Sequence, residues 1–153
     1  MNTNITLMNT NITELTTSPE VNVLLVDDLE ENREVLEFVL RHLDVNCHHA
    51  SSCDEAVQKC REIPFALIIL DYHMPVKNGF DTALLIKKLD KNADTPIIFL
   101  TADTESKNLD NKGYECGGVD FIYKPMDPRK IRSKVQVFAQ MHRKITTTQS
   151  LGA

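Results

Sequence analysis

Four apolar runs in this chain each end in a short group of polar residues. The runs are residues 21–26, 65–70, 96–100 and 119–123, and the groups that follow them are Asp27–Asp28, Asp71, Thr101 and Lys124–Pro125. Runs of this length, rich in Val, Ile, Leu and Phe, are typical of strands that are buried on both faces of a parallel sheet. Because the carboxyl ends of parallel strands lie at one edge of a sheet, where such folds bind ligands, we expect the polar groups to share one pocket.

Helical patterns separate the apolar runs. We predict a further strand at 45–50 and helices at about 29–43, 53–61, 80–89, 105–115 and 128–144. Apolar spacing assigns inward-facing positions to Val35, Leu36, Val39, Leu40 and Leu43 in the first helix, and to Phe80, Leu84, Leu85 and Leu89 in the third. Strands that alternate with helices predict an α/β fold, a doubly wound five-stranded parallel sheet with helices on both faces.

The chain divides into one folded domain and two tails. Residues 1–19 are rich in Asn and Thr and repeat MNTNIT, so they offer too little apolar surface to offset the entropy of ordering. We therefore predict a disordered tail at 1–19, a domain at 20–144 and a flexible C-terminal tail at 145–153.

From the composition, we expect that the chain does not belong to several classes of protein. The net charge of -5 gives no indication of nucleic-acid binding, which usually requires a basic domain. No apolar stretch approaches the length of a membrane span, and the N-terminus lacks the features of a secretory signal. The four cysteines form no CxxC pair, which favours reduced thiols in a cytoplasmic protein.

The residues at the strand ends indicate phosphoryl chemistry. Asp27, Asp28 and Asp71 would repel one another unless a cation neutralised them. Mg²⁺ suits such oxygen ligands, and Lys124 adds a compact positive charge. Asp71 would then be a carboxylate nucleophile, with Thr101 and Lys124 contacting the phosphoryl oxygens.

Each assignment has an alternative. The Asp27–Asp28 pair is often a helix N-cap, Thr101 a strand-end hydroxyl and Phe121 a core residue. The side chain of His73 either points to solvent or controls the access of water to Asp71.

In the order and spacing of these groups, the chain resembles the receiver domain of two-component response regulators. The motifs are DD, DYHMP, TA and KP, with thirty residues from Asp71 to Thr101 and twenty-three from Thr101 to Lys124. The resemblance covers residues 21–144 and implies a flavodoxin-like, three-layer fold with strand order 2-1-3-4-5.

The resemblance also implies a role for each residue of the site. Asp71 would be the phosphoacceptor, with Thr101 and Lys124 on the phosphoryl group. Asp28 would bind Mg²⁺ directly, Asp27 mainly through water, and the backbone carbonyl of His73 would complete the ligands. Thr101 and Phe121 would form the switch, and the Lys124–Pro125 bond would be cis.

We therefore expect a phosphorylation-dependent signalling switch and no metabolic enzyme, with at most self-phosphorylation and autodephosphorylation. The expected partners are a histidine kinase or histidine phosphotransfer protein and a downstream protein, contacted through the fourth helix, fifth strand and fifth helix. Alternatives are a phosphorelay intermediate, a fragment of a hybrid kinase or cyclic-dinucleotide regulator, a pseudo-receiver, and an aspartate-nucleophile phosphatase of the haloacid-dehalogenase type.

The last helix carries a further apolar pattern. Ile131, Val135, Phe138, Met141 and Ile145 form a stripe at near-heptad spacing. Its first half should pack on the sheet. The part beyond Phe138 predicts a partner contact or a homodimer.

Overall fold

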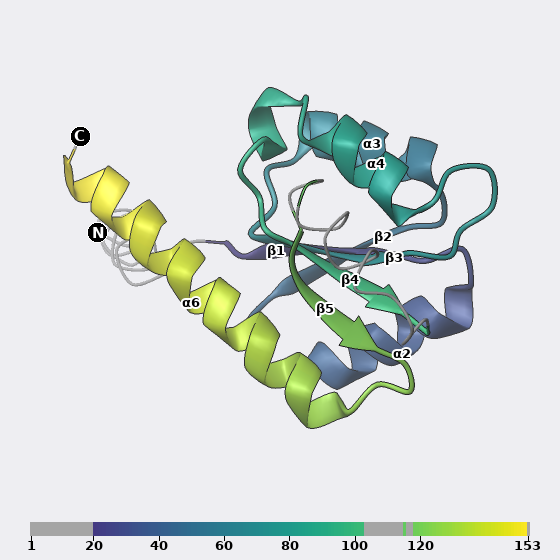
Figure 1. Cartoon of the computed structure of the whole chain (residues 1–153). Coiled ribbons are helices and arrows are strands. Elements are labelled where there is room, and N and C mark those ends of the chain that lie inside the picture. Colours follow the sequence, from purple (N-terminus) through teal and green to yellow (C-terminus); the bar gives the residue numbers. More distant parts are fainter. Residues whose placement is uncertain (1–19, 103–114, 116–117, 153) are drawn as a thin grey trace, which may run out of the picture.

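The computed structural model describes residues 20–102, 115 and 118–152, which form an open sheet between two layers of helices (Figure 1). The strands are β1 (Asn22–Val26), β2 (Asn46–Ala50), β3 (Leu67–Asp71), β4 (Ile97–Thr101) and β5 (Gly118–Tyr123). The helices are α2 (Glu30–Leu40), α3 (Cys53–Glu62), α4 (Gly79–Ile86) and α6 (Pro128–Gly152), with a 3-10 turn η1 (Asp90–Asn92). The predicted tail at 1–19 and nearly all of the predicted helix at 105–115 lie outside the described residues.

The five strands are parallel and lie in the order β2-β1-β3-β4-β5, which confirms the predicted fold. Helices α3 and α4 cover one face of the sheet, and α2 and α6 cover the other (Figure 1). Alternate residues of β1 show why the apolar runs are continuous. Leu24 packs toward α3 and α4, while Val23 and Leu25 pack toward α2 and α6. A strand that is covered on both faces has no solvent side on which polar residues could alternate.

Two predicted core positions are wrong. Val35 of α2 and Leu84 of α4 are both exposed. In α2 the buried residues are Leu36, Val39 and Leu40. Val35 precedes Leu36, and one residue turns the helix by about 100°, so it points away from the sheet. The same rotation separates Leu84 from the buried face of α4, which Phe80, Ala83 and Ile86 form.

Helix α6 is longer than predicted, because it continues past 144 to Gly152. The chain has no Gly or Pro between Pro128 and Gly152, so nothing in its sequence breaks the helix. Ile131, Val135 and Ala139 bury its first half against the sheet, and Figure 1 shows the second half projecting beyond it. Within the described ranges, neither α6 nor any other helix has the length and apolar character needed to cross a membrane.

One buried amide ties together the edge of the sheet where the strands begin. The Asn92 side chain donates to the carbonyls of Cys60 at 2.7 Å and Ile63 at 2.8 Å. Its oxygen accepts from the Phe65 N–H at 2.9 Å and from the Thr95 hydroxyl at 2.9 Å. These bonds join the end of α3, η1 and the residues that lead into β3 and β4.

The three cysteines that the structure describes are free thiols, as predicted. Burial raises the pKa of Cys60 to about 12. Burial and the nearby Glu37 carboxylate raise the pKa of Cys47 to about 11. Both thiols therefore stay protonated at neutral pH, which makes them poor nucleophiles. Cys116 lies outside the described residues.

The loop after β3 holds one strained residue. Val76 has a φ of 69° and is 101% exposed, and the Lys77 N–H donates to the Pro75 carbonyl at 2.8 Å across it. This is a γ-turn with positive φ, a conformation that is unfavourable for a β-branched residue.

We expect Val76→Gly to raise the free energy of unfolding by about 1 kcal/mol, because it relieves the strain and removes no buried surface. Urea denaturation of the purified protein measures the change. Val76→Ala is the matched control, since it keeps a Cβ and should recover much less. Equal stability of all three proteins would show that the turn is not strained.

Candidate functional site

Asp71 is the last residue of β3 and the centre of the candidate site. The residue is 3% exposed, and its position in the middle strand of the sheet places it between β1 and β4. The Lys124 ammonium lies 3.4 Å from Asp71 Oδ1, and the His73 N–H donates to the same oxygen at 3.3 Å. Both contacts are to Oδ1, so Oδ2 is the oxygen that they leave available for chemistry.

Asp27 follows β1 directly and is 1% exposed. Its two carboxylate oxygens accept from the Leu29 N–H at 2.9 Å and the Asn32 amide at 3.1 Å. The Arg33 guanidinium donates to the Asp27 carbonyl at 2.8 Å. Asp27 does not cap α2, because the N-cap residue of this helix is Leu29. The bonds of Asp27 therefore fix a carboxylate at the site rather than begin a helix.

Asp28 is exposed and completes a group of three carboxylates. Asp27, Asp28 and Asp71 each offer an oxygen, and these oxygens all lie within 4.8 Å of one another. Two oxygens bound to one Mg²⁺ at about 2.1 Å lie at most about 4.2 Å apart. The set is slightly wider than that limit, so it fits a small dication that takes some of its ligands through water.

Lys124 brings β5 to this group. The Lys124 ammonium lies 3.9 Å from Asp27 Oδ2 and 3.4 Å from Asp71 Oδ1. The backbone N–H of Lys124 donates to the Thr101 carbonyl at 2.8 Å. The Lys124–Pro125 peptide bond is cis, the isomer that the resemblance implies. A single ammonium thus faces two buried carboxylates, and the cluster keeps an excess of negative charge.

Thr101 and Phe121 lie on the neighbouring strands β4 and β5. Thr101 ends β4 with its side chain fully buried, and Phe121 is buried in β5 opposite Phe99. The structure therefore brings Asp27, Asp28, Asp71 and Lys124 together at the carboxyl edge of the sheet. Thr101 ends the strand beside Asp71, and Phe121 lies further back, in the core between the sheet and helices α3 and α4. The His73 side chain is exposed, and its ring makes an edge contact with Tyr72 at 4.7 Å.

The electrostatics of Asp71 reflect this crowding. Burial, and then the charge of Asp27, raise the pKa of Asp71 above its usual value, and Lys124 and the His73 N–H offset only part of the rise. The ionised form of Asp71 is therefore under-compensated, which is the condition that a bound cation relieves.

Sequence reasoning missed residues that hold the site in place. Asn32 and Arg33 fix Asp27, as described above. Gly79 begins α4, and a Cβ on it would lie 2.9 Å from both the Asp71 carbonyl oxygen and the Tyr72 Cα. The Gly79 N–H donates to the Tyr72 carbonyl at 2.9 Å. The glycine, visible in the sequence only as a helix breaker, lets α4 approach the backbone of Asp71.

Comparison with known proteins agrees with this geometry. The family model described as the response regulator receiver domain matches residues 23–136. This chain belongs to that family. Receiver domains are signalling modules of two-component systems, and the conclusion fits the strand order and the acidic group at the carboxyl edge.

Among the curated relatives is the transcriptional regulatory protein SrrA of Staphylococcus aureus (strain NCTC 8325 / PS 47). It is 34% identical to this receiver domain over 128 residues, which are 84% of this chain and 52% of SrrA. The chain therefore spans about half the length of the curated relatives that it matches.

Two solved structures illustrate the likeness. The chemotaxis protein CheY4 of Vibrio cholerae superposes with a TM-score of 0.73 at 28% identity, covering 78% of this chain and 98% of CheY4. The receiver domain of the sensor histidine kinase PA1611 of Pseudomonas aeruginosa PAO1 has a TM-score of 0.71 at 25% identity, with 79% and 98% covered. That structure is described as having a magnesium ion coordinated in its active site cleft.

The raised pKa of Asp71 predicts how stability depends on pH without metal. The folded state binds the Asp71 proton more tightly than the unfolded state does. Ionisation of Asp71 therefore lowers the stability of the fold as the pH rises above the ordinary pKa of an aspartate, near 4. We expect Asp71→Asn to stabilise the EDTA-treated protein at pH 7 by on the order of 1 kcal/mol, the size of one repulsion between close charges.

Well below pH 4, Asp71 is protonated in the folded and the unfolded state, and Asn is neutral at every pH, so this gain should disappear. Thermal and urea denaturation across pH 3 to 8 measure it. Asp44→Asn is the control, because the Asp44 side chain is exposed and lies outside the cluster. A gain that did not change with pH would contradict the electrostatic explanation.

Proposed function

We propose that this receiver domain is a phosphorylation-dependent switch in which Asp71 accepts a phosphoryl group from a histidine kinase or a histidine phosphotransfer protein. The observation that carries the proposal is the position of Asp71, a buried carboxylate within reach of Lys124 and two further carboxylates. Such a site favours phosphoryl transfer because positioning and charge neutralisation supply most of the catalysis in this reaction.

The transfer itself needs little from the protein beyond orientation. Asp71 Oδ2 would attack phosphorus while the bond from phosphorus to the donor imidazole nitrogen breaks, and the electron pair of that bond stays on the imidazole. Lys124 and the His73 N–H hold Oδ1 and so orient the carboxylate. Lys124 would then pair with one phosphoryl oxygen, and the Thr101 hydroxyl would donate to another.

Asp27, Asp28 and Asp71, with the backbone carbonyl of His73, would hold Mg²⁺, and the ion would neutralise charge on the carboxylates and the phosphoryl oxygens. The spacing of the three carboxylates supports this assignment. Asn32 and Leu29 keep the oxygens of Asp27 directed into the site.

The conformational response would involve Thr101 and Phe121. Movement of Thr101 toward the phosphoryl group would leave space that Phe121 fills. The surface formed by β5, α6 and the segment 105–115, predicted from the sequence as the fourth helix, would then change its population of states. We propose no metabolic reaction; self-phosphorylation from small phosphodonors and autodephosphorylation are the only chemistry required. The output would be a contact with a downstream protein.

We infer a cytoplasmic receiver without its own nucleic-acid contact, on the grounds of charge and composition. SrrA carries the name of a transcriptional regulatory protein and is about twice as long as the matched region. A phosphorelay intermediate or a fragment of a hybrid kinase or cyclic-dinucleotide regulator is therefore an equally consistent context for the switch.

Two further alternatives have less support. A haloacid-dehalogenase-type phosphatase uses a second acid two residues after the nucleophile, and here that position is the exposed His73. Rapid hydrolysis of a small phosphomonoester would favour it. A pseudo-receiver usually lacks an acidic residue or the lysine, and this chain has all of them.

We expect incubation with acetyl phosphate and Mg²⁺ to add one phosphoryl group to the protein, seen by intact-mass analysis. Asp71→Asn should take up none, and Lys124→Ala should react roughly 100-fold more slowly, as when one donor to a transition state is removed. Lys91→Ala is the control, because Lys91 lies at the other edge of the sheet. Persistent labelling of Asp71→Asn would contradict the assignment.

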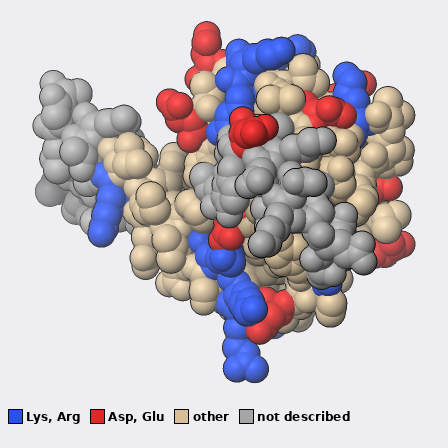
Figure 2. All heavy atoms as spheres, in the orientation of Figure 1, with Lys and Arg blue, Asp and Glu red and all other residues tan. Residues whose placement is uncertain are grey.

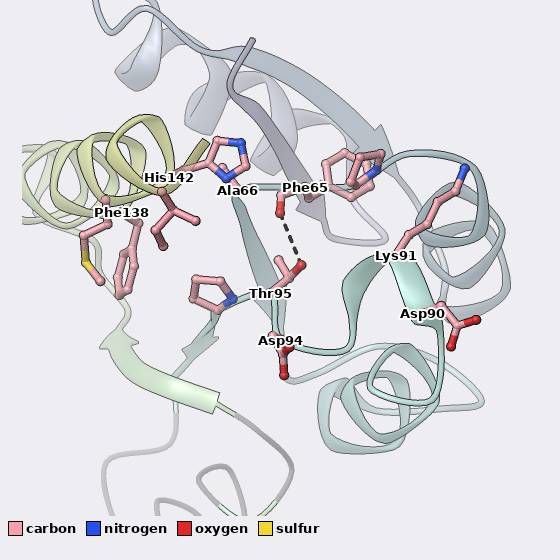
Figure 3. Close-up of a pocket in the computed structure, with 12 residues that line it drawn as sticks. Phe65, Ala66, Asp90, Lys91, Asp94, Thr95, Phe138 and His142 are labelled. Atoms are coloured by element: carbon pink, nitrogen blue, oxygen red, sulfur yellow. Dashed lines mark hydrogen bonds between the residues drawn. The ribbon is translucent and has the colours of Figure 1, made fainter. Parts of the chain in front are cut away.

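We also propose that a second copy of the chain packs on the projecting half of α6. Met141 and Ile145 are 50% and 55% exposed there. With Phe138 and His142 they line a cavity of about 430 Å³, whose opposite wall includes Phe65, Ala66 and Thr95 (Figure 3). Apolar side chains at near-heptad spacing on a helix favour a helical partner.

The charge on α6 affects the strength of such a dimer. The helix contains six Lys and Arg residues and no Asp or Glu, although the whole chain is acidic. Figure 2 shows basic side chains gathered over its first turns. Two copies of α6 side by side would repel one another, so a dimer along this helix should strengthen as salt screens the charges.

We expect the chain to dimerise at high micromolar concentration, and more readily at 0.5 M than at 0.05 M salt. Ile145→Asp should reduce dimerisation at least tenfold because it places a charge in the apolar contact. Sedimentation equilibrium measures this. Val137→Asp is the matched control, since Val137 is 53% exposed on the same helix but does not line the cavity. Equal loss in both variants, or a monomer throughout, would contradict the proposal.

A further inference from the structure

Five aromatic side chains form a continuous row from the phosphoacceptor loop to the edge strand. The row consists of Tyr72, Phe80, Phe99, Phe121 and Tyr123. Successive ring centroids lie 4.8, 5.0, 5.4 and 6.4 Å apart. These separations fall within the range over which aromatic rings interact favourably. We call this set the aromatic row.

Strand register builds the middle of the aromatic row. Phe99 of β4 lies directly opposite Phe121 of β5, and Tyr123 lies opposite Thr101, two residues further along both strands. Phe99 is fully buried, and Phe80 and Phe121 are buried with it in the layer between the sheet and helices α3 and α4. Close-packed interiors transmit displacements, because a ring that shifts must move its neighbours or leave a void.

The first end of the row is fixed to the phosphoacceptor. Tyr72 follows Asp71 in the chain; its N–H donates to the Leu100 carbonyl, and its carbonyl accepts from Gly79, both at 2.9 Å. The Tyr72 ring rests on Phe80, the residue after Gly79. A movement of the Asp71 backbone therefore reaches Phe80 through both the ring and the backbone of Tyr72.

The other end of the row reaches the surface. Tyr123 is 39% exposed at the end of edge strand β5, directly before Lys124. Its ring stacks on Phe121 with an interplanar angle of 18°. A protein that covered Tyr123 would thus contact one end of the aromatic row, whose other end, Tyr72, directly follows Asp71.

We propose that Phe80 and Phe99 are positioning residues that couple the Asp71 loop to Phe121 and Tyr123. This proposal rests on the function proposed above. Phosphorylation at Asp71 changes the packing of Tyr123 through the aromatic row. If phosphorylation changes the affinity of a partner that contacts Tyr123, binding of that partner changes the equilibrium constant of phosphorylation by the same factor.

A purely structural role makes a different prediction. If Phe99 only fills the core, Phe99→Leu lowers stability and leaves the link between Tyr72 and Tyr123 intact. If Phe99 carries the coupling, the variant breaks that link in a protein that remains folded. The two roles are separated by a spectroscopic signal at Tyr123, which a loss of stability alone does not move.

The experiment uses the full chain labelled with 3-fluorotyrosine and observed by ¹⁹F NMR, with the three tyrosine signals assigned by single Tyr→Phe variants. In the first part, which needs no phosphorylation, Tyr72→Leu should shift the Tyr123 signal. In the Phe99→Leu background that shift should fall at least twofold. Ile98→Val is the matched control, because Ile98 is fully buried on the same strand but packs on the opposite face.

In the second part, acetyl phosphate and Mg²⁺ are added, and intact mass gives the phosphoryl occupancy of each sample. At equal occupancy, the shift of the Tyr123 signal should be at least twofold smaller in Phe99→Leu than in the wild type or Ile98→Val. Phe99→Met, which keeps most of the volume, replaces Phe99→Leu if circular dichroism shows that the latter is unfolded.

The outcomes separate this proposal from the function on which it rests. A wild-type chain that takes up no phosphoryl group contradicts the proposed function, while the first part still tests the aromatic row. Shifts at Tyr123 that are unchanged by Phe99→Leu in the first part, or at equal occupancy in the second, overturn the coupling role of Phe99.

Discussion

Two buried carboxylates share one ammonium in this protein, and the arrangement of the site follows from that imbalance. Asp27 and Asp71 are almost inaccessible to solvent, and Lys124 contacts both. Water cannot screen charges at such depth, so the remaining negative charge must be met by hydrogen bonds or by a cation. Hydrogen bonds from the Leu29 and His73 N–H groups and from the Asn32 amide hold carboxylate oxygens that would otherwise separate.

The two edges of the sheet have different tasks. At the amino-terminal edge, the fully bonded Asn92 amide holds α3, η1 and β3 together. At the carboxyl edge, a charged group is left partly uncompensated and ready for a ligand. The two edges therefore differ in kind: the buried polar group at one edge is fully hydrogen-bonded, and the carboxylates at the other carry an excess of charge.

The sequence predicted the five strands, their layers and the group of side chains at the carboxyl edge, because each of these depends on local patterns. Continuous apolar runs show burial on both faces, and polar residues at their ends show the edge. The inward positions of Val35 and Leu84 were wrong, because apolar character alone does not give the direction of a helix face. The roles of Asn32, Asn92 and Gly79 depend on contacts with residues distant in the chain, which no local pattern records. The end of α6 could have been predicted, since no Gly or Pro lies between Pro128 and Gly152.

The length of α6 turns the helix into a lever arm. Its first half is anchored in the core up to Ala139, and the thirteen residues from 140 to 152 continue for about 20 Å at 1.5 Å per residue. A tilt of about 10° at the anchor would carry the far end through roughly 3.5 Å, although the buried contacts near Ile131 and Val135 would shift by far less. Small adjustments within the close-packed core are therefore magnified at the C-terminal end of the helix, where a neighbouring protein could detect them.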